Sequence, residues 1–189
     1  MAVVTRHPGL LRREETGLVL VDVQEAFRPV IDGFEGVAAA CGLLAEGFGV
    51  LGRPVLVTAQ YPKGLGAVVP EVADRLREGA EPIEKLRFSA CGAEGFDRAI
   101  EEAGCRAWVV GGIEAHVCVS QTVLDLLARG YAVHVAADAV SSRTARNREL
   151  GLRRMEAAGA VVTSAEMALF EMMETAGTDE FKAISRLVR

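Results

Sequence analysis

The sequence is poor in the residues that build disulfide frameworks and metal sites. Among 189 residues there are four cysteines and three histidines. The cysteines form no CxxC pair, and the histidines form neither an HxxxH nor an HExxH pattern. Disulfide-rich domains need many closely spaced cysteines, and histidine-based zinc sites need closely spaced imidazoles. We therefore expect reduced thiols, no metal and no other cofactor.

The chain also lacks a strong charge of one sign and a long apolar run. Lys plus Arg is 21 and Asp plus Glu is 26, which gives a formal net charge of -5 and no electrostatic reason to bind nucleic acid or an anionic membrane. A membrane-spanning helix needs roughly 20 mostly apolar residues. The first apolar run, Gly17–Val23, is much shorter and contains Asp22, and the preceding segment is too polar for a signal-peptide core. We expect a cytoplasmic protein without nucleic-acid or membrane partners.

What the sequence does have is a regular alternation of two kinds of segment. Half of the residues are hydrophobic and a quarter are charged, as in a folded single domain. Short runs rich in Val, Ile and Leu are nearly continuous in their hydrophobicity, which is typical of parallel strands covered on both faces. These predicted strands are Gly17–Val23, Pro54–Gln60, Pro82–Lys85, Arg106–Gly112, Tyr131–Asp138 and Ala160–Thr163.

The longer segments between these runs have helical spacing and end at glycines. The predicted helices are Phe34–Gly49, Pro70–Arg77, Ala93–Ala103, His116–Arg129, Thr144–Ala158 and Asp179–Leu187. Strand and helix repeated about six times predict an α/β fold. Specifically, we expect a single-domain, doubly wound, mostly parallel six-stranded sheet with helices on both faces. Ligands of such sheets bind beyond the carboxyl ends of the strands.

Three chemically unusual residues stand at predicted strand ends. Asp22 follows the first strand, Lys85 ends the third, and Cys118 follows the fourth strand and opens a helix. A helix N-terminus and a nearby ammonium both lower the pKa of a thiol. A cysteine, a lysine and an aspartate in one crevice would make an activated nucleophile with a proton carrier.

Each of these residues also has an ordinary interpretation. A single cysteine is usually an inert core residue, an aspartate after a strand is often a turn or cap residue, and a lysine is usually a solvated charge. Their shared position at strand carboxyl ends is what favours a common site.

Three motifs, in this order, resemble those of the isochorismatase-like cysteine hydrolases. They are Val21-Asp22-Val23-Gln24, Glu84-Lys85-Leu86-Arg87-Phe88-Ser89-Ala90, and Gly111-Gly112-Ile113-Glu114-Ala115-His116-Val117-Cys118. The resemblance covers about residues 15–175 within a single domain of residues 1–189. Together with Gln60-Tyr61-Pro62-Lys63-Gly64 and Ser141-Ser142-Arg143, it is greatest for the isochorismatase domain-containing subgroup.

The resemblance implies a catalytic triad of Asp22, Lys85 and Cys118. It also implies a non-proline cis peptide between Ile113 and Glu114, with the backbone N–H groups of Glu114 and Cys118 forming an oxyanion hole. Nicotinamidases in this superfamily hold a metal with an aspartate and histidines after the second strand. The segment Thr58–Gly64 has neither residue type, so we expect no such metal and no nicotinamidase activity. True isochorismatases replace the nucleophilic cysteine, which this chain retains.

Four further residues occupy positions where a substrate pocket wall is expected: Gln24, Phe27, Gln60 and Tyr61. The two aromatic residues could equally be core or interface residues. His116 precedes Cys118 by two residues, and we interpret it as a packed or loop-orienting side chain. Gly64 and Gly66 are too short a glycine pattern for dinucleotide binding.

The function that we predict is hydrolysis of an amide-type C–N bond in a small molecule through a thioester on Cys118. Two alternatives are a catalytically silent scaffold and a redox-sensing thiol protein on the same fold. Apolar residues in Phe34–Gly49 and in Ala165–Met173 predict a homo-oligomer.

Overall fold

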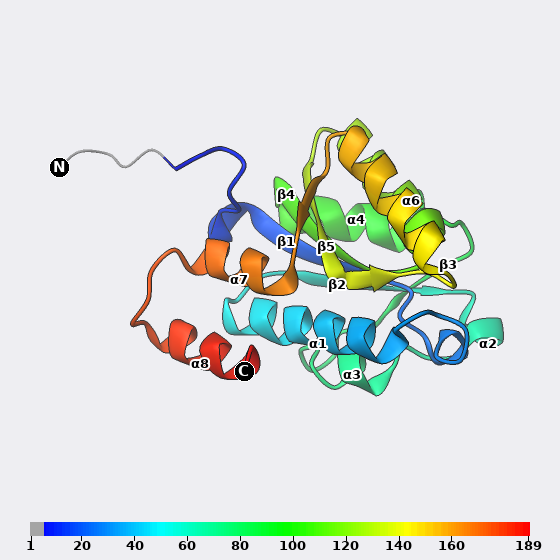
Figure 1. Ribbon diagram of the computed structural model, residues 1–189, viewed down its shortest axis with the longest axis horizontal. Helices are drawn as coiled ribbons and strands as arrows, with labels where there is room; N and C mark the ends of the chain where they lie inside the picture. The colour runs from blue at the N-terminus through cyan, green and yellow to red at the C-terminus, as the bar shows by residue number, and fades with distance from the viewer. Residues whose placement is uncertain (1–5) are drawn as a thin grey trace.

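The computed structural model describes residues 6–189. It contains six strands and a set of helices that alternate along the chain (Figure 1). The strands are β1 (Thr16–Val21), β2 (Val55–Gln60), β3 (Ile83–Lys85), β4 (Ala107–Ile113), β5 (Ala132–Ser141) and β6 (Val161–Thr163). The α-helices are α1 (Phe34–Val50), α2 (Pro62–Leu65), α3 (Pro70–Ala73), α4 (Glu94–Ala103), α5 (Ser120–Ala128), α6 (Ala145–Ala157), α7 (Ala165–Met173) and α8 (Asp179–Leu187). Short turns η1 (Arg13–Glu15), η2 (Glu25–Phe27) and η3 (Ala115–Val119) complete the order.

The strands form one sheet in the order β3-β2-β1-β4-β5-β6. The sequence predicted a mostly parallel sheet. Every pairing between these strands is parallel, so the sheet is in fact fully parallel. The strand order reverses between β1 and β4. Such a switch point leaves a crevice at the carboxyl ends of the two strands.

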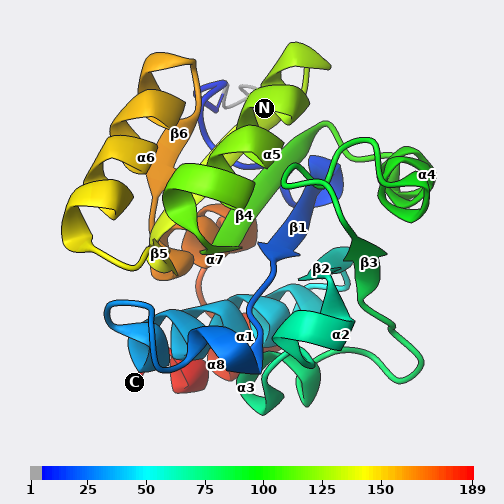
Figure 2. The same cartoon turned by 90° about the vertical axis from the view of Figure 1, so that its right-hand side faces the viewer.

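Helices cover both faces of the sheet, which explains the continuous apolar strands. One face carries α1, α3, α7 and α8, and the other carries α4, α5 and α6 (Figure 1, Figure 2). Alternate residues of β1 enter the two cores: Leu18 and Leu20 pack with the α1 side, and Val19 and Val21 with the α5 side. A strand buried on both faces must be apolar at every position.

At one point β1 and β4 approach each other closely. Gly112 pairs with Val21 in the register and has a φ of 117°. A Cβ atom at Gly112 would collide with the backbone of Val21. A glycine is therefore required where the two central strands end.

The helix predictions were confirmed in most places, with a few differences. The helix expected over Pro70–Arg77 ends at Ala73, and the helix expected from His116 begins as the turn η3 before α5. Helix α2 was absent from the predicted set, whereas α7 coincides with the apolar stretch Ala165–Met173. Helix α2 spans four residues after a Tyr-Pro step, too short for a periodic pattern.

Candidate active site

Asp22 directly follows β1 and is completely buried. Its φ of 54° is unusual for a residue other than glycine, and such backbone strain is concentrated at functional sites. Its Oδ1 accepts a hydrogen bond from Thr58 Oγ1 at 2.7 Å, and its Oδ2 accepts one from Lys85 Nζ at 2.7 Å. The burial of this carboxylate is thus compensated by a hydroxyl group and a cation.

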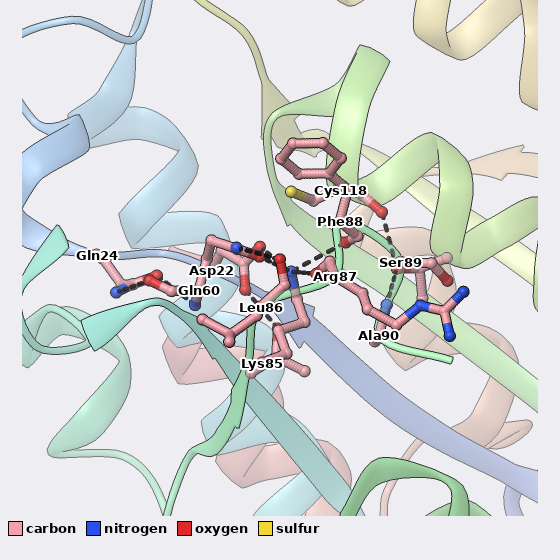
Figure 3. Close-up of polar contacts among 12 residues, drawn as sticks. Asp22, Gln24, Gln60, Lys85, Leu86, Arg87, Phe88, Ser89, Ala90 and Cys118 are labelled. Carbon is pink, nitrogen blue, oxygen red and sulfur yellow. Dashed lines mark hydrogen bonds and ion pairs between the residues drawn. The ribbon is translucent and has the colours of Figure 1, made fainter. Parts of the chain in front are cut away.

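Lys85 ends β3, and its side chain is fully buried. Its Nζ donates to Asp22 Oδ2 and Gln60 Oε1, both at 2.7 Å, and to the carbonyl oxygens of Phe88 and Arg87 at 2.9 and 3.2 Å. An ammonium has three protons to donate, so these four acceptors occupy all of them. Lys85 is therefore a fixed, fully hydrogen-bonded cation (Figure 3).

Cys118 lies in η3, a π-helical turn that leads into α5, and is 7% exposed. Turns of this kind occur frequently at functional sites. The pKa of the Cys118 thiol is raised to about 12, mainly by burial and next by the charge of Asp22, whereas the charge of Lys85 lowers it. The prediction of a lowered thiol pKa was wrong, because burial and the carboxylate outweigh the ammonium. Asp22 and Lys85 are in contact with each other and both act on the Cys118 thiol, so the three predicted triad residues lie close together.

The peptide bond between Ile113 and Glu114 is cis, as the family resemblance implied. The side chain of Glu114 accepts hydrogen bonds from the backbone N–H and Nε of Arg143, at 2.9 and 3.1 Å. His116 Nδ1 lies 3.0 Å from Ser142 Oγ, in keeping with a loop-orienting role. Both contacts connect the turn after β4 to the turn after β5.

The two glutamines predicted as pocket wall are bonded within the protein. Gln24 donates to the carbonyl oxygens of Gln60 and Gly66, and it accepts the backbone N–H of Gln60 at 2.8 Å. Gln60 donates from Nε2 to the carbonyl oxygen of Leu86 at 2.9 Å and accepts Lys85 at Oε1. Their contact with a substrate remains a prediction.

The two predicted aromatic wall residues differ in exposure. Phe27 is half-buried and packs against the core on the α1 side. Tyr61 is half exposed, has a φ of 37°, and lines a cavity of about 380 Å³ together with Pro62, Lys63 and Leu86. The strained backbone of Tyr61 holds its ring beside the segment that carries Lys85.

The loop after β3 presents apolar side chains around this site. The carbonyl oxygens of Leu86, Arg87 and Phe88 all accept bonds from Gln60 or Lys85. With its carbonyl groups directed inward, the loop exposes Leu86 (75%) and Phe88 (55%). Two apolar side chains and that of Arg87 are therefore exposed directly after the buried Lys85.

Sequence reasoning missed Thr58 and Thr122. Thr58 is buried and donates to Asp22. Thr122 Oγ1 donates to the carbonyl oxygen of Cys118 at 2.7 Å and accepts the N–H of Ala90 at 2.9 Å, which ties the β3–α4 loop to the nucleophile turn. For Thr58 the available signal was a hydroxyl group in an otherwise apolar run, close to the end of β2, whereas Thr122 lies in α5, where the sequence carries no such signal.

Within residues 6–189, no group of three or more His, Cys, Asp or Glu side chains is arranged to hold a metal ion. In the same part of the chain, no helix combines the length and apolar character needed to cross a membrane.

Comparisons with known proteins show which family and which fold this chain resembles. The secreted isochorismatase effector Isc1 of Phytophthora sojae (strain P6497) is 38% identical over 100% of this chain and 91% of its own length. Isochorismatase domain-containing protein 1 of Salmo salar is 39% identical over 89% of this chain. The matched region covers 59% of the length of that protein. The structure described as MAR1 ribonuclease from Caenorhabditis elegans superposes with a TM-score of 0.90 at 35% identity, covering 95% of this chain and 92% of that one. Residues 16–167 match the family model of the isochorismatase domain, and the chain therefore belongs to the isochorismatase family.

Proposed function

We propose that the protein is a cysteine hydrolase that cleaves an amide-type C–N bond of a small molecule through a thioester on Cys118. The observation that carries this proposal is the buried Asp22–Lys85 ion pair, whose charges both act on the Cys118 thiol. A buried ion pair is costly to maintain for stability alone. Beside a thiol it has a chemical use, because it supplies a base and a compensating cation.

Acylation begins with the thiol protonated at neutral pH, since its pKa is raised to about 12. The proton passes from Cys118 Sγ to the Asp22 carboxylate as the sulfur attacks the substrate carbonyl carbon. The oxyanion that forms is stabilised by the backbone N–H groups of Glu114 and Cys118. The C–N bond then breaks, and Asp22 gives its proton to the leaving nitrogen.

Deacylation uses the same residues in reverse. Asp22 removes a proton from a water molecule, whose oxygen attacks the thioester carbonyl carbon. The C–S bond breaks, the acid product leaves, and the sulfur recovers the proton from Asp22. Lys85 keeps its charge throughout and balances whichever of Asp22 or Cys118 is negative.

Two measurements test the proposal directly. A panel of small aliphatic and aromatic amides is incubated with the protein, and release of ammonia or amine is measured. Mass spectrometry of rapidly quenched samples then locates the acyl group. We expect amine release and an acyl adduct on Cys118. A panel without turnover and without any adduct on Cys118 would contradict the hydrolase.

The redox-sensor alternative is less well supported by the site. Peroxide-sensing cysteines are thiolates, with a low pKa and good exposure. Cys118 is buried and its pKa is raised. Mild peroxide should leave its mass unchanged, and a thiol-reversible mass shift at Cys118 would favour the sensor.

A small-molecule substrate is also favoured over RNA, although one structural relative is described as a ribonuclease. The net charge of -5 offers no attraction for phosphates, and the nucleophile is buried. We expect no cleavage of single-stranded RNA under conditions in which an amide is hydrolysed.

A homo-oligomer and a cytoplasmic location also belong to this proposal. The apolar surface of α1 is covered within the chain, but α7 leaves Met167 (54%) and Phe170 (39%) exposed. Light scattering at micromolar concentration should give a mass above that of the 20.1 kDa chain. A monomer mass would refute the oligomer.

One relative is described as secreted, so location needs its own test by cell fractionation.

A further inference from the structure

We propose that Gln60 is a positioning residue: its side-chain amide holds the Lys85 ammonium and the loop after β3 in place, and through Lys85 it controls how readily Cys118 gives up its proton. This inference rests on the proposed function, because it assumes that Asp22, Lys85 and Cys118 work together.

The position of Gln60 follows from the sheet register. Gln60 is the last residue of β2 and pairs with Lys85, the last residue of β3, so both side chains leave the sheet at the same level. Gln60 Oε1 accepts from Lys85 Nζ at 2.7 Å, and its Nε2 donates to the carbonyl oxygen of Leu86 at 2.9 Å. One amide therefore binds the cation and the loop that encloses it (Figure 3).

Gln60 is itself held firmly by Gln24, which is completely buried. The N–H and the carbonyl oxygen of Gln60 both bond to the side-chain amide of Gln24, at 2.8 and 3.1 Å. The remaining Nε2 bond of Gln24 goes to the carbonyl oxygen of Gly66 at 2.8 Å. With its backbone clamped in this way, Gln60 has little freedom to move away from Lys85.

The amide matters most when Asp22 is protonated. In the resting site Asp22 is the anionic partner of Lys85, and this charge disappears when Asp22 takes the proton of Cys118. Among the described contacts of Lys85, the acceptors that remain are the neutral oxygens of Gln60, Arg87 and Phe88. The Gln60 contact is the shortest of these three, and an amide oxygen accepts equally well in both states of Asp22. Gln60 thus keeps the cation in place when the new thiolate needs it.

These bonds also argue against Gln60 as a substrate contact. Its oxygen and its nitrogen are both engaged inside the protein. A substrate could bond to Oε1 only by displacing the buried Lys85 ammonium, which would then lose an acceptor at a high cost. Positioning of Lys85 is the role that fits both contacts.

A double-mutant cycle tests the inference without any substrate. Gln60→Leu, Lys85→Met and the double variant are compared with the unaltered protein. The rate of Cys118 alkylation by iodoacetamide is followed by peptide mass mapping at each pH from 7 to 11. Gln121→Leu, on an exposed position of α5, is the matched control. Thermal denaturation shows whether each variant folds, and Gln60→Met replaces Gln60→Leu if the latter does not.

We expect Lys85→Met to slow alkylation of Cys118 at a given pH by more than tenfold, because the thiolate loses its cation. Gln60→Leu should slow it by about tenfold, which corresponds to one pKa unit. The double variant should be no slower than Lys85→Met, and Gln121→Leu should match the unaltered protein.

Three results would overturn the inference. An unchanged rate in Gln60→Leu would show that Lys85 does not need the amide. A Gln60→Leu effect that persists in the Lys85→Met background would be an effect on reagent access. An unchanged rate in Lys85→Met would remove the proposed triad as well. Failure of every tested amide alongside the expected cycle would contradict the proposed hydrolase but not the positioning of Lys85 by Gln60.

Discussion

The two faces of the sheet both bury cysteine, and two of these thiols, Cys41 on one face and Cys118 on the other, differ in their surroundings. Cys41 lies in α1, is completely buried, and donates from Sγ to the carbonyl oxygen of Ala139 at 3.3 Å. Cys118 lies in η3 on the other face, close to Asp22 and Lys85. Burial is the first cause of the raised pKa in both, and both pKa values are raised to about 12.

The difference shows that the resting pKa does not identify a nucleophile. The charge that raises the pKa of Cys41 is that of Asp138, which accepts the backbone N–H of Ala165 at the start of α7. The carboxylate that raises the pKa of Cys118 is Asp22, which is paired with the Lys85 cation. A thiol with a high pKa can still react if a base accepts its proton during the attack. Of these two thiols, Cys118 is the one that the proposal pairs with such a base, Asp22, and with a compensating cation.

The largest expected effect comes from removing each thiol in turn. Cys118→Ala should lower kcat by about a thousandfold or more on any substrate that is hydrolysed, because the covalent step disappears. Cys41→Ala should retain activity within a fewfold. Steady-state rates on one amide provide the comparison, and equal losses in the two variants would mean that the faces do not differ in function.

A second comparison replaces each of the two carboxylates, Asp22 and Asp138, by an amide. Asp22→Asn should abolish turnover, and it leaves the buried Lys85 without an anionic partner, which typically costs about 3–5 kcal/mol. Asp138→Asn should cost no more than about 1 kcal/mol, because asparagine caps a helix N-terminus nearly as well as aspartate. Urea denaturation measures both free energies of unfolding. A fully stable Asp22→Asn protein would show that Lys85 is not charged in the folded state.

A third comparison uses alkylation of the unaltered protein. With a pKa of about 12, the thiolate fraction of Cys118 should rise about tenfold for each pH unit between 8 and 10. Alkylation of Cys118 by iodoacetamide should follow that slope, whereas Cys41 should react only when the protein unfolds. Rapid, pH-independent labelling of Cys118 at pH 6.5 would instead indicate the thiolate that the sequence predicted.

The smallest expected effect is on stability in alkali. The folded-state pKa of Cys41 is raised above the unfolded-state value, so the folded protein keeps a proton that the unfolded chain has lost. The resulting stabilisation is complete below about pH 8.5 and decreases by up to ~1.4 kcal/mol per pH unit as pH rises toward the folded-state pKa. Cys41→Ala should reduce the slope of unfolding free energy against pH between pH 9 and 11. An unchanged slope would mean that the Cys41 thiol ionises in the folded protein.

The sequence was informative wherever a residue's position along the chain determines its place in the fold. Asp22, Lys85 and Cys118 were recognisable because parallel strands bring their carboxyl ends to one edge. The roles of Thr58 and Gln60 were not, because they depend on register and on the direction of each side chain. The predicted shift in the pKa of Cys118 had the wrong direction, because the burial that raises this pKa is a property of the assembled core. The last residues of β5 were missed because their pairing with β4 resumes after a register shift between Val110 and Gly112.

The glycine contact between β1 and β4 has a consequence for how the site tolerates change. Gly112 and Val21 meet backbone to backbone, one residue before Asp22 and a short turn before Cys118. The spacing between Asp22 and Cys118 therefore depends on a contact between main-chain atoms as well as on the side chains packed around it. Any side chain introduced at position 112 would separate the two residues at once.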